Sequence, residues 1–275
     1  MNSPQSGNKY SWQAFGLRAL LALGIGVLMM QVNLDYLESY LYDLRIRSTG
    51  FSSPESPIEI IYINQQTIET HKGFPSAKNQ NTLLKHLKKA PTLAVVYDFD
   101  IKESPGPESE QNEWEASLVT SPNIYVAGRS TPLKGEEDQL WLPEPLEKVS
   151  LTPSPKTTDL VNFAKDGVTR RMVLTYQNTP LLPVTVASLA NPEIADPQNV
   201  QGGFDFYGTH QGYINFHRAK SFNFRSFDEA LSSAPEDFKN KIVLIGTDLG
   251  LDENEYVLTP FSRSVMAMTR AELQA

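Results

Sequence analysis

The chain has 275 residues, a formal net charge of -8 and no cysteine. This length allows a membrane anchor plus one large domain or two small ones. The acidic balance argues against nucleic acid or anionic lipid as a partner of the soluble part. The absence of cysteine excludes disulfides, thiol nucleophiles and thiolate metal sites.

An apolar segment near the N-terminus, residues 12–32, has about the length that one helix needs to cross a bilayer. No small-x-small cleavage site follows Met30, so the segment is predicted to be a retained transmembrane anchor rather than a removed signal. Lys9 and Arg18 favour a cytoplasmic leader, residues 1–11, with everything after Asn33 outside the cytoplasm.

The segment that follows, residues 33–47, carries a regular leucine pattern. Leu34, Leu37, Leu41 and Leu44 alternate at spacings of three and four among polar residues. Such a stripe on a stalk helix that continues from the membrane would hold two copies side by side as a homodimer. The alternative is that these leucines pack on their own globular domain, and the repeat is too short to decide.

In the rest of the chain, short β-branched apolar runs alternate with amphipathic segments. Strands are predicted at 58–63, 93–99, 123–127, 212–216 and 241–245, with one exposed on one side at 167–176, and helices at 79–89, 110–120, 183–190 and 226–234. The proline-rich residues 133–158 are predicted to be a long surface excursion. The pattern predicts an α/β domain with a largely parallel sheet covered by helices, preceded by one N-terminal transmembrane helix that continues into a stalk helix.

Acidic side chains follow the predicted carboxyl ends of two inner strands. They are Asp98, Asp100 and Glu103 after the second strand, and Asp248, Asp252, Glu253 and Glu255 after the last one. Ligands of open α/β sheets bind beyond these strand ends, and two acidic loops there could hold Ca²⁺ or Mg²⁺. The alternative, which we favour, is that these carboxylates cap helices and turns, because no EF-hand spacing is present.

Other patterns of site chemistry are weak. The four histidines, His71, His86, His210 and His217, have no partners at metal-site spacing. The glycines at 246 and 250 follow a strand but lack the Walker lysine and serine. Neither a Gly-x-Ser-x-Gly elbow nor a His-Glu-x-x-His motif occurs. The sequence therefore predicts no catalytic set and no cofactor.

Taken together, the segments resemble a CHASE2 domain, the extracytoplasmic sensor of bacterial transmembrane receptors. The resemblance covers most of residues 36–265, and the matching stretches are Tyr-Asp-Leu-Arg at 42–45, 60–64, Gly-Phe-Pro at 73–75, 97–101 with Glu103, Asp-Gly-Val-Thr-Arg-Arg at 166–171, 212–216, 238–246 and Thr-Pro at 259–260. No single motif decides, but their order and spacing are specific as a set.

This resemblance implies a non-catalytic sensor at residues 48–265, followed by further membrane helices and a cytoplasmic output module. Such modules include adenylate or guanylate cyclases, diguanylate cyclases and kinases. Residues 266–275 resemble the start of the helix that feeds the next membrane span. Asn64 stands where the family commonly has aspartate, and Lys78 stands in place of the usual arginine.

The expected function is the sensory input of a membrane signalling receptor, in the bacterial inner membrane with its main domain periplasmic. The expected ligand is an unidentified small molecule or envelope protein, and the candidate ligand-binding residues are Asn64, Lys78, Asp98, Asp100, Glu103, Asp248 and Asp252. Any enzymatic output would lie beyond residue 275. The alternative is a stand-alone anchored module that binds another envelope protein and transmits nothing.

Overall fold

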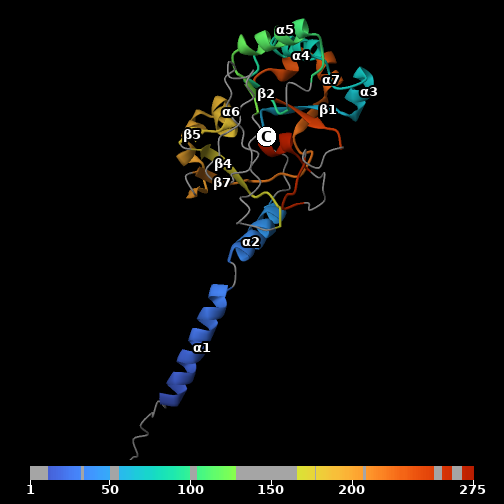
Figure 1. The fold of residues 1–275 in the computed structure, drawn as a ribbon. Coiled ribbons are helices and arrows are strands. Elements are labelled where there is room, and N and C mark those ends of the chain that lie inside the picture. The colour runs from blue at the N-terminus through green and yellow to red at the C-terminus, as the bar shows by residue number, and fades with distance from the viewer. Residues whose placement is uncertain are drawn as a thin grey trace, which may run out of the picture.

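The computed structural model describes residues 12–31, 34–49, 56–99, 104–127, 166–176, 178–206, 209–250, 256–261 and 268–275. Helices α1 (Trp12–Gln31) and α2 (Leu34–Thr49) precede the domain, and α1 extends away from it beyond α2 (Figure 1). Val32 and Asn33 lie outside the described residues, as does the predicted excursion at 133–158. Within the described ranges, no helix combines the length and the apolar character that crossing a membrane requires.

A parallel sheet forms the centre of the domain. Its five strands have the order β3-β2-β9-β1-β8, with bounds β1 (Ile58–Asn64), β2 (Ala94–Tyr97), β3 (Ile124–Val126), β8 (Asn223–Ser226) and β9 (Ile242–Asp248). All four strand pairings are parallel. The predicted largely parallel sheet is therefore confirmed for this part of the domain.

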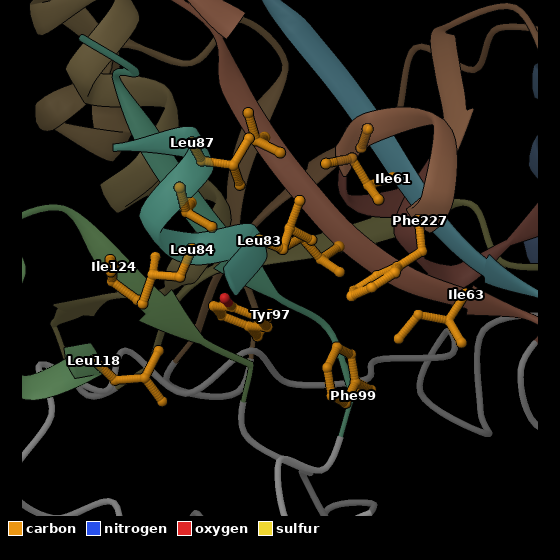
Figure 2. Packing of buried hydrophobic residues seen from close by; sticks show 14 of the residues in the cluster. Ile61, Ile63, Leu83, Leu84, Leu87, Tyr97, Phe99, Leu118, Ile124 and Phe227 are labelled. Atoms are coloured by element: carbon orange, nitrogen blue, oxygen red, sulfur yellow. The ribbon is translucent and has the colours of Figure 1, made fainter. Parts of the chain in front are cut away.

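The first face of this sheet is covered by α4 (Ala77–Leu87), α5 (Glu108–Val119) and α7 (Phe227–Ser232). Leu83, Leu84 and Leu87 of α4 are fully buried against Ile61 and its neighbours, as Figure 2 shows. This helix corresponds to the amphipathic segment predicted as a helix at 79–89. The alternation of buried side chains along β1 sends Ile61 and Ile63 to this face.

The second face receives Ile60 and Tyr62 of β1 and is covered by α6 (Leu182–Ala190) and α8 (Arg270–Gln274). Helices thus cover both faces, as parallel sheets require because both of their faces are apolar. Ala271 of α8 lies so near β9 that a Cβ atom on Gly246 would be 2.7 Å from the Ala271 Cβ. Glycine at 246 therefore permits this close approach of α8 to β9.

A second sheet, which is antiparallel, was not predicted as a separate unit from the sequence. It has the order β5-β4-β7-β6, built from β4 (Arg171–Tyr176), β5 (Thr179–Pro180), β6 (Gly203–Phe206) and β7 (Thr209–Tyr213). Short connections join β4 to β5 and β6 to β7, and these favour antiparallel hairpins, whereas α6 lies between β5 and β6. Of the strand predicted at 167–176, residues 171–176 form β4; of the one predicted at 212–216, only residues 212 and 213 lie in β7.

Several short elements were not predicted. Helix α3 (Gln65–His71) follows β1 directly, and a two-stranded pair joins β10 (Tyr256–Val257) to β11 (Met268–Thr269). The expected single helix at 266–275 is wrong for Met268 and Thr269, which are strand, while residues 266 and 267 lie outside the described ranges. Helix α8 begins only at Arg270, where Thr269 and Glu272 form a capping box.

Candidate functional site at the stalk junction

Three of the seven predicted ligand residues, Asn64, Asp98 and Asp248, lie at one edge of the parallel sheet. Asn64 and Asp248 are register partners at the carboxyl ends of β1 and β9. Asp98 follows β2 and donates its backbone N–H to the carbonyl of Ile245 at 2.8 Å. Lys78 lies apart, exposed in the first turn of α4, and Asp100, Glu103 and Asp252 lie outside the described residues.

Two of these side chains have structural partners. The Asn64 Oδ1 accepts hydrogen bonds from the backbone N–H and the hydroxyl of Thr67, at 3.0 and 3.1 Å, and so caps α3. Asp248 accepts a hydrogen bond from the Tyr256 hydroxyl at 2.6 Å. Among the described residues, no group of three histidine or acidic side chains is arranged to hold a metal.

A more completely built arrangement lies where α2 meets the domain. Ser39, Tyr42, Asp43 and Ile46 are each at most 6 % exposed, and they recur at the i, i+3, i+4, i+7 spacing of one helix face. Tyr42 and Ile46 pack with Phe216, Val257 and Met268 in a small apolar cluster. One face of the stalk helix is therefore part of the domain core.

The polar centre of this junction is Arg170, which is 1 % exposed. Its Nε and Nη2 donate to the two carboxylate oxygens of Asp43 at 2.8 and 2.9 Å. Its Nη1 and Nη2 donate to the two oxygens of Asp166 at 3.0 and 2.8 Å. Arg170 thus joins the stalk to the segment that enters β4 through two bidentate pairs, the strongest geometry that arginine offers.

This environment keeps Arg170 charged. Burial by itself would lower the pKa of Arg170, but the hydrogen bonds and charges of Asp166 and Asp43 outweigh that effect and raise the pKa above its ordinary value. The guanidinium of Arg170 is therefore held in its cationic form.

Further contacts fix α2 along its length. The Tyr42 hydroxyl donates to the carbonyl of Ile214, whose own N–H donates to the carbonyl of Arg170 at 3.0 Å. Nearer the domain, Arg47 Nε donates to the carbonyl of Pro260 at 2.6 Å. The rings of Tyr42 and Tyr213 lie 5.2 Å apart. The stalk is therefore held by two backbone carbonyls of the domain, that of Ile214 just after β7 and that of Pro260 just after β10.

The opposite face of α2 carries the predicted leucine stripe. Leu37, Leu41 and Leu44 are 51 to 55 % exposed, whereas the side chain of Leu34 lies outside what the structure describes. With Leu41 at heptad position a and Leu37 and Leu44 at d, the domain covers positions b, c and f. The alternative that these three leucines pack on their own domain is therefore wrong.

The junction was missed from the sequence although two of its parts were quoted as separate motifs, at 42–45 and 166–171. The buried face of α2 includes Ser39 and Asp43, so a search for apolar periodicity alone passes over it. The signal that could have linked the two motifs is a carboxylate, Asp43, at a helical i, i+3, i+4, i+7 position, together with the adjacent arginines 170 and 171 elsewhere in the chain.

The CHASE2 domain family matches this chain over residues 19–275, a range that includes the stalk, both sheets and α8. The chain belongs to the CHASE2 family. CHASE2 domains are extracytoplasmic sensors of transmembrane receptors and are not catalytic. No curated protein matches the chain, and no solved structure does. In this CHASE2 domain, Arg170 connects two of the stretches that carried the resemblance, 42–45 and 166–171.

Proposed function

We propose that this chain is the sensory input domain of a bacterial membrane signalling receptor and that it signals as a homodimer through α2. Family membership supports the sensory role. The dimer and the route of the signal rest on the stalk junction described above. The output would be a cytoplasmic cyclase, diguanylate cyclase or kinase module.

The observation that carries the proposal is the division of α2 into two unlike faces. One face is joined to the domain through Asp43 and Arg170, so a movement of the domain must move the helix. The other face leaves Leu37 and Leu41 exposed at d and a positions, where a second copy would bury them. A rigid connection on one side and a free apolar seam on the other suit a helix that transmits rotation or a register shift.

The anchor is part of the same proposal. In α1, large apolar side chains are exposed on all sides, from Phe15 to Val27, at 48 to 71 % of their surface. Large apolar side chains exposed around a helix fit a lipid environment better than water. We place it in the bacterial inner membrane, with the sensor domain in the periplasm.

The test of pairing uses cysteine cross-linking in the full chain, in its own membranes. Because the chain has no native cysteine, each single variant reports one position. Leu37→Cys and Leu41→Cys should form disulfide-linked dimers on mild oxidation. Tyr36→Cys, which is 52 % exposed at heptad position c, is the matched control and should form little. Absence of dimers at 37 and 41, or equal yields at all three positions, overturns the pairing.

The coupling to an output module needs a second measurement. An immunoblot of native membranes against the domain should give a band far above 30.7 kDa on a denaturing gel, because an output module adds mass beyond residue 275. A band near 30.7 kDa overturns the proposed transducer and supports the stand-alone binding module.

A further inference from the structure

A pocket of about 190 Å³ lies between α6 and the second face of the parallel sheet. Its floor is formed by Ile58 and Ile242, which are register partners at the amino ends of β1 and β9, and by the paired Val96 and Leu244. Val186 and Ala187 of α6 form one wall. The pocket is thus far from Asn64 and Asp248, which lie at the carboxyl edge of the same sheet.

The lining is almost wholly hydrocarbon. Asn191, at the exposed end of α6, is the one polar side chain among the described residues that line the pocket, and no charged side chain lines it within those ranges. The Asn191 Oδ1 accepts a hydrogen bond from the backbone N–H of Glu193 at 3.2 Å. Apolar walls give water few hydrogen-bond partners, so such a space is better filled by an apolar molecule.

The size limits the occupant. A protein cavity of ~150 Å³ with apolar walls binds benzene, so this pocket suits a molecule of roughly eight heavy atoms. We propose that it binds a small, uncharged, mainly hydrocarbon ligand with one polar group that Asn191 receives at the rim. This inference rests on the proposed sensory function, and it names the chemical class of the ligand.

The wall of the pocket is connected to the stalk by one continuous stretch. Arg170 immediately precedes β4, the β4–β5 pair follows, and Leu181, which donates its N–H to the carbonyl of Leu174 at 2.9 Å, leads into α6. A ligand that shifts α6 against the sheet therefore acts on the strand next to the Arg170–Asp43 pair. Coupling carried by packed, hydrogen-bonded elements is the physical route that such a shift requires.

The test uses primary alcohols from 1-butanol to 1-decanol and the thermal unfolding of the purified full chain. Each added methylene should tighten binding by about fourfold until the pocket is full, after which the gain stops. The variant Ala187→Phe fills the pocket and should abolish the chain-length dependence. Ala116→Phe, an exposed alanine of the distant helix α5, is the matched control and should keep it.

All variants are measured in the same detergent or lipid preparation. Partition of the alcohol into that detergent or lipid therefore lowers its free concentration equally for every variant. If Ala187→Phe does not fold, Ala190→Phe at the pocket rim replaces it. Unchanged melting of the parent chain across the series overturns the ligand site, and so does equal behaviour of the pocket variant and Ala116→Phe.

A last arm separates this inference from the proposed function. In the Leu41→Cys background, 1-octanol should change the rate of stalk cross-linking by about fivefold or more, and Ala187→Phe should remove that effect. Binding without any change in cross-linking overturns the coupling to the stalk. Cross-linked dimers without alcohol binding overturn the ligand site and leave the dimer. Alcohol binding without cross-linked dimers overturns the proposed dimer and leaves the ligand site.

Discussion

Arg170 and Asp43 form a buried bidentate ion pair between residues that are 127 positions apart, with side chains 1 and 7 % exposed. Asp43 belongs to the helix that leaves the domain, and Arg170 to the segment that enters its antiparallel sheet. The pair therefore decides that α2 moves with the domain and not as a free stalk. The apolar cluster of Tyr42 and Ile46 and the Tyr42 and Arg47 hydrogen bonds hold α2 at the same position.

Replacing Arg170 with methionine should leave Asp43 and Asp166 buried without their cation. Loss of one member of a buried ion pair costs ~3–5 kcal/mol in the free energy of unfolding. Urea unfolding of the full chain should show a loss of this size. Lys85→Met is the control, because Lys85 and Glu113 pair with side chains 59 and 62 % exposed, and it should leave the midpoint unchanged. Equal midpoints for the two variants would contradict the role of Arg170.

Replacing both Leu37 and Leu41 with aspartate should convert the dimer to a monomer without unfolding the domain. Both side chains are more than half exposed, so the substitution costs little within one copy but places charges in the proposed seam. Sedimentation of the full chain measures the mass, and Tyr36→Asp serves as the control. If the parent chain and the double variant have the same mass, the pairing is wrong.

Replacing Gly246 with alanine should destabilise the domain by ~1–3 kcal/mol, because its new Cβ atom would overlap Ala271 of α8 and overpacking has costs of this order. The double variant with Ala271→Gly removes the overlap and should recover part of the loss. Ala271→Gly alone should cost ~1 kcal/mol from helix propensity. Strictly additive effects in urea unfolding would show that the two residues do not meet.

Stability should fall at alkaline pH through buried tyrosines. Burial raises the pKa of Tyr97, and burial together with the charge of Glu272 raises the pKa of Tyr62. Both tyrosines remain neutral when folded, whereas unfolded tyrosine ionises near pH ~10. Their contribution is therefore complete below that pH and is lost progressively above it.

Tyr97→Phe should reduce the loss of stability between pH ~9 and ~11, because it removes one group that ionises only in the unfolded chain. Urea unfolding at several alkaline pH values measures the slope. The variant and the parent should agree at neutral pH far better than at pH ~11. Identical slopes would mean that Tyr97 ionises in the folded domain.

Elements whose pattern lies within a few residues were predicted well. The apolar run at 58–63 became β1, and the helices predicted at 79–89 and 226–234 became α4 and α7. Helix α3 was missed because its seven residues carry little apolar periodicity and depend on the cap from Asn64. The division of the strands into a parallel and an antiparallel sheet was missed because the residues of a strand do not specify which other strand it pairs with.

Of the candidate site, too, one part could be predicted from the sequence and the other part could not. That Asn64, Asp98 and Asp248 lie on neighbouring strands follows from their place after strand ends, since parallel strands finish at one edge. That Asp43 pairs with Arg170 does not follow, because each lies in its own local pattern and only the folded chain brings them within hydrogen-bond distance.

By itself, the sequence determined the α/β class, the positions of the main helices and strands, the leucine stripe and the resemblance to the CHASE2 family, because these depend on local spacing and composition. Tertiary structure alone decided which face of α2 is buried, how the two sheets divide the strands, and where α6 leaves a pocket. The physical reason is that burial and pairing depend on contacts between distant segments. On α2, Asp43 is buried and Leu41 is exposed, the reverse of what polarity alone predicts. This is possible because the distant Arg170 compensates for the buried charge of Asp43.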